Sequence, residues 1–290
     1  MRKWVALLAL VVAAGLMMWV PQGSSKDINN NFTDYRVISH AMGGIREHAY
    51  TNSYEAFIAN YEKGNRVFEV DLLLTADGHL VARHEWTQYM TELLGQKGEL
   101  PKDKQSGRLT YSDFKNSKIL GTYEPLDWSD ILDLMEHYPD IYIVTDTKEQ
   151  EPADMQKELE ILVDTAKKRD PALLERVVPQ IYDQPMLDMV NGIYEFPSII
   201  YTLYATKDTD QEVIDFAASH SIEAVTIPES RAKPDFLAKL KKAGITAYVN
   251  TINDPSEIGR LQRMGVTGVY SDFVTEQELG DNRWVVALGW

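Results

Sequence analysis

Two carboxylates stand two residues apart in a segment that is otherwise apolar. Glu69 and Asp71 lie within the run 68–74, and His84 follows shortly after it. Side chains at positions i and i+2 of a strand point to the same face, so both acids project together from a strand whose composition favours burial. Neighbouring buried carboxylates repel each other and lose hydration unless a positive charge lies between them. The spacing therefore predicts a site for a divalent cation, with His84 near enough to act as an acid or a base.

Residues of the same chemical kind end two other predicted strands. His40 ends the segment 36–40, and the apolar segment 141–146 ends in Asp146, with Lys148 two residues further on. Three carboxylates suit one hard divalent cation, Ca²⁺ or Mg²⁺, and leave coordination positions open for a substrate. Two histidines beside such a cation suit general acid–base catalysis, and Lys148 suits the charge that develops on a phosphoryl group.

Each of these residues has a plainer explanation when it is taken alone. A histidine at a strand end is commonly structural, and an acid there commonly forms a cap or an ion pair. Lys148 suits an ion pair with Asp146. The combination favours chemistry, because several strand ends bring titratable side chains to one face.

The elements that must position these side chains alternate between strand-like and helix-like patterns. Strand-like runs occur at 36–40, 66–74, 79–84, 141–146, 177–182, 198–203, 222–227, 245–250 and 268–271, and amphipathic stretches at 153–168, 210–219, 232–243 and 255–264. Such alternation predicts an α/β protein with a parallel sheet, and its length favours a single-domain (β/α)₈ TIM barrel over 36–290. Nine runs for eight places leave one extra strand. Asp77-Gly78 predicts a hairpin between the second and third runs, but the sequence does not decide which run is extra.

Two local features refine this architecture. Residues 86–125 are polar and weakly periodic, and they predict a long excursion over one face of the barrel. In the first unit, Asn52 with Glu55 three residues later predicts a helix N-cap, and Gly64 suits the helix C-terminus. The loop 41–51 then leaves the carboxyl end of the first strand, which is the face where barrel enzymes hold their active sites.

Composition narrows the class of protein. The chain has 290 residues, 44% of them hydrophobic, no cysteine and a net charge of −15. The absence of cysteine excludes disulfides, thiolate metal sites and cysteine nucleophiles. The acidic balance argues against nucleic acid or an anionic membrane surface as the main partner, but a small anionic substrate remains compatible with a bound cation.

The N-terminus has the pattern of a targeting segment. Arg2 and Lys3 precede an apolar run over 4–20, so residues 1–23 are expected to be a signal peptide or a signal anchor, followed by a linker at 24–35. We expect export to the extracellular space or the cell surface, with membrane attachment through this segment if it is not cleaved.

The chain resembles the glycerophosphodiester phosphodiesterase family, which is related in fold to phosphatidylinositol-specific phospholipase C. The motifs that carry the resemblance are His40-Ala41, Asn52-Ser53-Tyr54-Glu55-Ala56-Phe57, Glu69-Val70-Asp71, Thr75-Ala76-Asp77-Gly78, His84-Glu85, Asp146-Thr147-Lys148, the segment 250–255 and the segment 265–273. Together they span about 36–275.

The resemblance implies a barrel fold and hydrolysis of a phosphodiester. It implies His40 and His84 as the acid–base pair and a divalent cation held by three acids, Glu69, Asp71 and Asp146. It places Lys148 near the phosphate. In this family a neighbouring alcohol of the substrate attacks phosphorus with the help of the metal, and the cyclic phosphate is then hydrolysed.

Three departures from the family pattern concern the substrate. Ala41 replaces an arginine that contacts phosphate, Asp146 replaces a glutamate, and Asn250 replaces a tryptophan at a substrate-facing position. Lysine does not reproduce the bidentate geometry of arginine. The candidates to replace it are Arg46, Arg83 and the backbone amides of Gly43-Gly44.

Three functions are compatible with these observations. The leading one is an exported, metal-dependent phosphodiesterase that acts on a small glycerophosphodiester or a related phosphodiester. The second is a phospholipase-type enzyme that acts on a lipid headgroup. The third is a catalytically impaired barrel that binds a phosphorylated ligand, which the retention of both histidines and all three acids disfavours.

Overall fold

Eight parallel strands close into a ring in the computed structural model, which describes residues 31–281. The ring runs β1-β2-β4-β5-β6-β7-β8-β9 and back to β1. The strands are β1 (Val37–Ser39), β2 (Val67–Leu74), β4 (Tyr142–Thr147), β5 (Val177–Ile181), β6 (Ile200–Thr202), β7 (Ala224–Pro228), β8 (Thr246–Asn250) and β9 (Gly268–Ser271). The predicted TIM barrel is confirmed, and each of its strands coincides with a predicted run, although β4 and β7 each end one residue later than predicted.

The extra strand is β3 (Leu80–Ala82), which pairs antiparallel with β2 outside the ring. The turn between them closes through a hydrogen bond from Thr75 N to His79 O. Gly78 adopts φ +80°, a left-handed conformation that favours glycine. The Asp-Gly signal therefore located the hairpin, and β3 carries the chain out of the barrel toward residues 86–125.

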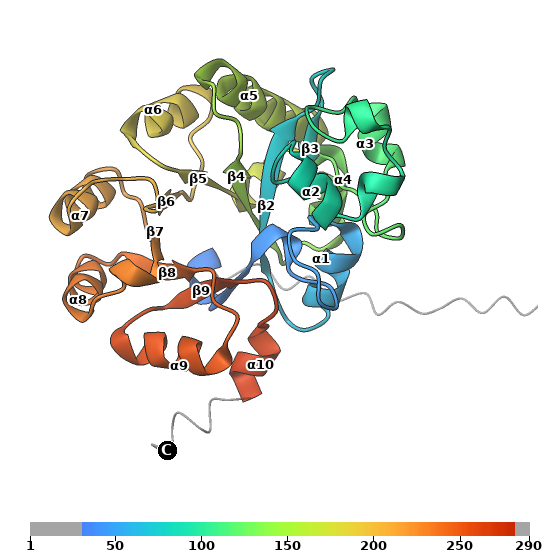
Figure 1. Cartoon of the computed structure of the whole chain (residues 1–290). Coiled ribbons are helices and arrows are strands. Elements are labelled where there is room, and N and C mark those ends of the chain that lie inside the picture. The colour runs from blue at the N-terminus through green and yellow to red at the C-terminus, as the bar shows by residue number, and fades with distance from the viewer. Residues whose placement is uncertain (1–30, 282–290) are drawn as a thin grey trace, which may run out of the picture.

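Helices surround the ring, and Figure 1 shows α5 to α9 on its outside. The barrel helices are α1 (Tyr54–Tyr61), α4 (Trp128–His137), α5 (Pro152–Arg169), α6 (Gln184–Ile193), α7 (Asp210–Ser219), α8 (Pro234–Lys242), α9 (Pro255–Met264) and α10 (Glu276–Asp281). Short 3₁₀ turns occupy Phe32–Asp34, His40–Met42, Gln96–Gly98, Lys102–Lys104, Pro171–Arg176 and Glu229–Arg231. The four predicted amphipathic stretches correspond to α5, α7, α8 and α9.

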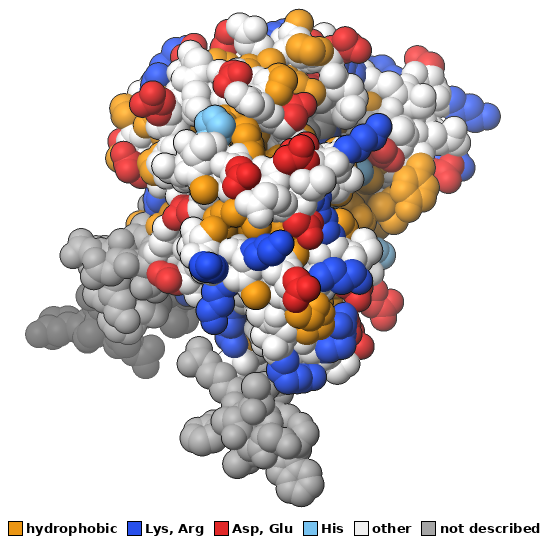
Figure 2. Space-filling model, turned by 90° about the vertical axis from the view of Figure 1, so that its left-hand side faces the viewer, with side chains coloured by type: hydrophobic (Ala, Val, Ile, Leu, Met, Phe, Trp, Pro, Cys, Tyr) orange, Lys and Arg blue, Asp and Glu red, His pale blue; other side chains and the backbone are white. Residues whose placement is uncertain are grey.

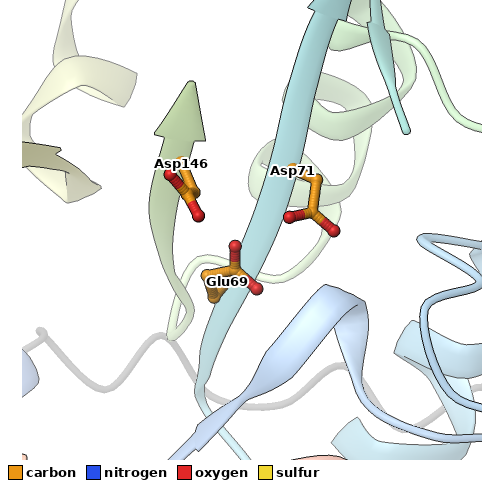
Figure 3. A group of neighbouring side chains, drawn as sticks. All are labelled: Glu69, Asp71 and Asp146. Carbon is orange, nitrogen blue, oxygen red and sulfur yellow. The ribbon is translucent and has the colours of Figure 1, made fainter. Parts of the chain in front are cut away.

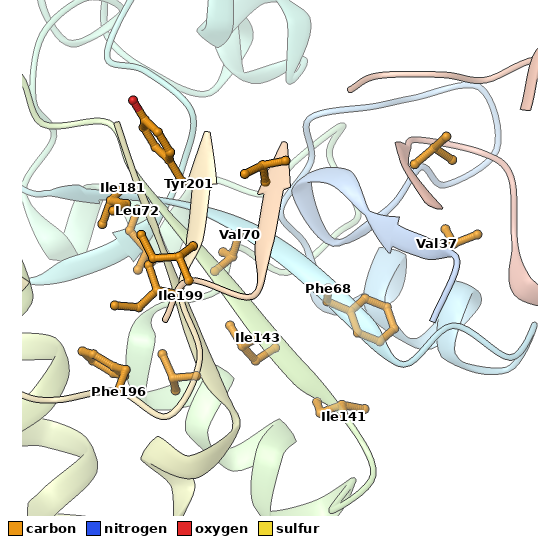
Figure 4. Close-up of a cluster of buried hydrophobic side chains, with 14 of the residues drawn as sticks. Val37, Phe68, Val70, Leu72, Ile141, Ile143, Ile181, Phe196, Ile199 and Tyr201 are labelled. Atoms are coloured by element: carbon orange, nitrogen blue, oxygen red, sulfur yellow. The ribbon is translucent and has the colours of Figure 1, made fainter. Parts of the chain in front are cut away.

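The main core lies between the strands and these helices. Side chains alternate along each strand, so Phe68, Val70 and Leu72 of β2 face outward and pack with Ile143 of β4, as Figure 4 shows. The other residues of β2 face the barrel interior: Val67 belongs to the apolar cluster there, and Glu69 and Asp71 share its face. The alternation that builds the core therefore also places both acids inside the barrel.

The barrel interior changes from apolar to polar along its axis. Phe32 closes one end by packing against Tyr142 and Tyr248. Further up, Gln180 Oε1 accepts hydrogen bonds from Thr202 and Tyr270. The acids lie on β2 and β4, which also line this interior.

Residues 86–125 form a subdomain of short helices, which we call the excursion. It contains α2 (Gln88–Leu93) and α3 (Tyr111–Asn116). Two small clusters stabilise it, one formed by Val81, Leu100, Leu109 and Phe114, the other by Met90, Leu94, Ile119 and Tyr123. Figure 1 shows α2 and α3 grouped beside β3.

The predicted N-cap at Asn52 is wrong. Helix α1 begins one residue later, and the Ser53 side chain accepts the hydrogen bond from Ala56 N. Asn52 has φ +45° and directs its amide to Asp71. A long-range hydrogen bond to the site thus replaces the local cap.

Charge is unevenly distributed over the surface. On the face drawn in Figure 2, Lys and Arg side chains gather in the lower half, around α8 and α9. The last turn of α8 alone carries Lys239, Lys241 and Lys242.

The predicted targeting segment 1–23 and most of the linker 24–35 lie outside the described residues. Within 31–281, no helix is long and apolar enough to cross a membrane.

Candidate active site

Three buried acids converge at the carboxyl end of the barrel. Glu69, Asp71 and Asp146 are 1%, 0% and 6% exposed, and each offers a carboxylate oxygen within 4.8 Å of the others. Asp71 and Asp146 are register partners on the neighbouring strands β2 and β4. Figure 3 shows the three carboxylates around a common space. The three predicted ligands are therefore brought together.

The oxygen atoms of this cluster are only partly satisfied. Glu69 Oε2 accepts a hydrogen bond from Ala41 N at 2.7 Å, while Glu69 Oε1 is buried and has no hydrogen-bond partner within the described residues. Asp71 Oδ2 accepts from Asn52 Nδ2 at 2.8 Å, and its Oδ1 lies 2.9 Å from Lys148 Nζ without hydrogen-bond geometry. Buried acceptors without donors are costly. Converging unsatisfied carboxylate oxygens fit one hard divalent cation.

The pKa values reflect the crowding of negative charge. Burial and the charge of Asp71 raise the pKa of Glu69. Burial also opposes ionisation of Asp71, but Lys148 and both histidines lower its pKa below the usual range. The neighbouring side chains therefore favour the ionised form of Asp71 but disfavour the ionised form of Glu69. An additional positive charge in the cluster would stabilise both carboxylates.

Lys148 lies inside this cluster. Its ammonium group forms ion pairs with Asp71 and Asp146. Burial opposes its charge, but the acids outweigh that effect and raise its pKa. Asp146 is bound on its other oxygen by the hydroxyl of Tyr182. The sequence offered two alternatives for Lys148, an ion pair with Asp146 or a place beside the acids. Both are present in the structure.

His40 is oriented by Asp272. Its Nδ1 lies 2.8 Å from Asp272 Oδ1, and Asn253 Nδ2 donates to the other oxygen of Asp272 at 2.8 Å. Burial opposes protonation of His40, but Asp272 and the acids outweigh it and raise its pKa to about 9. The Asp272 contact occupies Nδ1, so Nε2 is the nitrogen that is free for a substrate.

His84 has the opposite electrostatic character. Burial lowers its pKa, and its buried Nδ1 has no hydrogen-bond partner within residues 31–281. The ring of Tyr50 separates it from His40, with centroid distances of 4.9 Å to His40 and 5.3 Å to His84. The two predicted acid–base residues therefore flank one aromatic ring.

The structure does not bring the proposed arginine replacements to the acids. Arg83 is buried in the excursion, where its guanidinium donates to Gln96, Thr91 and the carbonyl of Glu85. Arg46 lies exposed in the turn between Ile45 and His48. The Arg83 prediction is corrected on this point, because its donors are already bound elsewhere.

The glycine amides are also engaged. Gly43 N donates to His40 O, and Gly44 N donates to Asp272 O. A Cβ on Gly44 would lie 2.3 Å from the Phe273 ring, so the close approach requires glycine. These amides stabilise the loop rather than offering donors to a phosphate.

Asn250 ends β8 on the same face as Tyr248, which lies inside the barrel. Its Oδ1 is buried and has no hydrogen-bond partner within the described chain. An unsatisfied acceptor at the barrel mouth suits a hydroxyl group of a substrate.

Four residues at this site were not predicted from the sequence to belong to it: Tyr50, Asn52, Tyr182 and Asp272. Asp272 and Asn52 stand within motifs of the family pattern, which was the available signal. Tyr50 and Tyr182 carried no comparable signal.

A cavity of about 220 Å³ lies beside the site, between His84, Trp86 and Lys148. A larger one of about 350 Å³ lies between Tyr54 and α4, and it contains none of the predicted site residues. Of these two cavities, the smaller one is lined by predicted site residues, His84 and Lys148.

Comparison with known proteins identifies the family of this chain. The model of the glycerophosphoryl diester phosphodiesterase family matches residues 43–276. No curated protein sequence gives a significant match.

Solved structures share the fold at low sequence identity. A putative glycerophosphoryl diester phosphodiesterase from Silicibacter pomeroyi DSS-3 is 18% identical, with a TM-score of 0.68, covering 90% of this chain and 96% of its own. The Thermotoga maritima glycerophosphodiester phosphodiesterase is 21% identical, with a TM-score of 0.59 and coverage of 85% and 96%. An Oleispira antarctica phosphodiesterase, solved with the product sn-glycerol-3-phosphate, is 17% identical, with a TM-score of 0.68 and coverage of 86% and 97%.

Proposed function

The chain belongs to the glycerophosphoryl diester phosphodiesterase family, and on that premise we propose that it hydrolyses a small glycerophosphodiester with the aid of one divalent cation. The observation that carries the proposal is the buried cluster Glu69, Asp71 and Asp146, with two orphaned oxygens and a histidine on each side. The product found in the Oleispira antarctica enzyme supports a glycerol-linked substrate.

Glu69, Asp71 and Asp146 would hold the cation, Ca²⁺ or Mg²⁺, which when bound supplies positive charge for the phosphoryl oxygens. Lys148 keeps Asp71 ionised and adds its own charge beside the phosphate. Asn250 Oδ1 accepts a hydrogen bond from a hydroxyl group of the substrate.

The two histidines divide the proton transfers. His84, whose pKa is lowered, takes the proton of the substrate hydroxyl that attacks phosphorus. His40, which Asp272 keeps protonated, gives its Nε2 proton to the leaving oxygen as the bond from phosphorus to that oxygen breaks. In the second step His40 takes a proton from water, the water oxygen bonds to phosphorus, and His84 returns its proton to the glycerol oxygen as the cyclic ester opens.

The test is hydrolysis of glycerophosphocholine and bis(p-nitrophenyl) phosphate by the full-length chain, after EDTA treatment and after addition of Ca²⁺ or Mg²⁺. We expect turnover that EDTA abolishes and one of the cations restores. No turnover of any phosphodiester with either cation, together with tight binding of glycerol phosphate, would leave a binding protein instead.

We propose in addition that the chain is exported, because Arg2 and Lys3 precede the apolar run 4–20. Cell fractionation of the full-length protein and of a variant lacking residues 1–23 tests this. The full-length chain is expected in the extracellular or membrane fraction, and recovery of both in the cytoplasm would contradict it.

A further inference from the structure

Tyr50 occupies the space between the two histidines. Its ring meets His40 and His84 edge-on, at interplanar angles of 82° in both contacts. Among the described residues, it is the aromatic side chain in ring contact with both. A substrate that reaches both histidines must therefore pass beside this ring.

The backbone around Tyr50 is held in an unfavourable conformation. Tyr50 has φ +61°, and Ala41, Met42, Arg46 and Asn52 of the same loop also have positive φ. Each such non-glycine residue costs about 1 kcal/mol or more, and such costs concentrate at functional sites. The hydrogen bond from Asn52 N to Ala41 O fastens the loop, and the Tyr50 ring packs against the second cluster of the excursion. The ring is thus fixed from two sides.

The hydroxyl of Tyr50 is a free donor. It makes no hydrogen bond to any other residue in the part of the chain that the structure describes, and the residue is half-buried. Burial, followed by the charges of Asp272 and Asp71, raises its pKa. The group therefore stays neutral and can donate its proton in a hydrogen bond.

The other donors near the histidines are already engaged. Position 41 is alanine, Arg83 binds the excursion, and both glycine amides donate to backbone carbonyls. The ammonium of Lys148 is paired with Asp71 and Asp146. Besides the imidazole N–H groups themselves, a phosphodiester between the histidines thus meets the Tyr50 hydroxyl, a side-chain donor that no other described residue engages.

We propose that Tyr50 is a substrate-binding residue that replaces the missing arginine: its hydroxyl donates a hydrogen bond to a non-bridging phosphoryl oxygen, and its ring sets the separation of His40 and His84. The inference rests on the proposed function and adds a residue to it. A neutral hydroxyl gains less than a guanidinium does from an additional negative charge on the bound phosphate. Relative to a site with an arginine at this position, the site should therefore bind the doubly charged monoester product less strongly.

The experiment compares Tyr50→Phe and Tyr50→Ala with the matched control Tyr54→Phe, whose residue lies on α1 beside the other cavity. Because a hydrogen bond to a charged group is lost, Tyr50→Phe should lower kcat/KM for glycerophosphocholine about 10- to 100-fold, mainly through KM, with the pH profile unchanged. Tyr50→Ala should in addition change kcat and the pH profile, because the histidines lose their spacer. Tyr54→Phe should equal the wild type.

Binding of sn-glycerol-3-phosphate, measured by calorimetry, separates this inference from the proposed function. A wild type that turns over substrate, with Tyr50→Phe equal to it in kcat/KM and in binding, overturns the role of Tyr50 and leaves the phosphodiesterase activity standing. A chain that hydrolyses nothing but loses affinity for the ligand in Tyr50→Phe supports the role of Tyr50 and overturns the activity.

Discussion

Asn52 and Asp71 are joined by two hydrogen bonds that run in opposite directions. Asn52 Nδ2 donates to Asp71 Oδ2 at 2.8 Å, and Asp71 N donates to Asn52 Oδ1 at 3.1 Å. Both side chains are fully buried. One asparagine therefore fixes the loop before α1 to strand β2 and orients a proposed metal ligand.

Replacement of Asn52 should separate backbone strain from hydrogen bonding. Asn52→Gly tolerates φ +45° but leaves two buried groups of Asp71 without partners, at roughly 1–3 kcal/mol each. Asn52→Ala loses the same bonds and adds about 1 kcal/mol of strain. Urea denaturation measures both. An Asn52→Ala variant as stable as the wild type would contradict the assigned contacts.

Divalent cations should stabilise the folded chain. After EDTA treatment, Ca²⁺ or Mg²⁺ at about 100 times its Kd should raise the free energy of unfolding by roughly 2.7 kcal/mol, seen as an increase in Tm. Glu69→Gln should raise the Tm of the cation-free protein at neutral pH, because the raised pKa of Glu69 shows that its charge is unfavourable, and it should abolish the response to cations.

Glu158→Gln is the control for this measurement. Glu158 is likewise a buried glutamate, but it accepts a hydrogen bond from Thr147 and lies outside the acid cluster. It should keep the response to cations. Loss of the response in Glu158→Gln but not in Glu69→Gln would place the cation elsewhere.

Asp272 should set the pKa of His40. In the cation-free protein, NMR should find a pKa of about 9 for His40, and Asp272→Asn should shift it toward 6.5. Because the folded-state pKa exceeds the unfolded one, the stability from this pair is complete below about pH 6.5 and is lost as pH rises through 9. The pKa of His84, which burial lowers, is the internal control. An unchanged His40 titration would dismiss the role of Asp272.

The leaving group should distinguish the two histidines. On glycerophosphocholine, His40→Ala and His84→Ala should each lose on the order of 10²- to 10⁴-fold in kcat. On the p-nitrophenyl ester of glycerol phosphate, whose leaving group needs no proton, His40→Ala should recover most of its first-step rate and His84→Ala should not. The reverse pattern would exchange the two roles, and near-normal rates in either variant would remove it from the mechanism.

Arg83 should matter for stability and Arg46 should not. Arg83→Met leaves the buried acceptors on Gln96 and Thr91 without a donor, at roughly 1–3 kcal/mol each, whereas the exposed Arg46→Ala should stay within about 0.5 kcal/mol of the wild type. Denaturant unfolding of both variants checks this. If the Arg83→Met variant had normal stability and a raised KM, Arg83 would instead be a phosphate-binding residue, as the sequence suggested.

The sequence predicted the ring and the convergence of the three acids because both follow from local patterns. Apolar runs located the strands, and the spacing of Glu69 and Asp71 placed them on the face that turned out to be the barrel interior. Asn52 was misassigned because a capping pattern is read over four residues, while its partner Asp71 lies 19 residues away. Asp272 reaches His40 only because β9 closes onto β1, a pairing that no local pattern contains.

Arg83 illustrates a different limit. It shares the face of β3 with Val81, which packs against Leu100 and Phe114 of the excursion. The alternation of side chains along β3 could have predicted that Arg83 faces the excursion. That prediction required knowing that the hairpin lies outside the ring, which the sequence did not decide.

The position of β3 outside the ring has a consequence for how the enzyme can diversify. The acids and His40 belong to the closed barrel, where each strand is hydrogen-bonded to a strand on either side. A shift of one strand therefore also shifts its neighbours. His84 and the packing partners of Tyr50 belong to the arm that β3 starts, which contacts the barrel through Trp86 and Arg108. The proposed metal ligands and the surroundings of the Tyr50 ring thus belong to different parts of the molecule, so a change within residues 86–125 can alter the substrate pocket without replacing any proposed metal ligand.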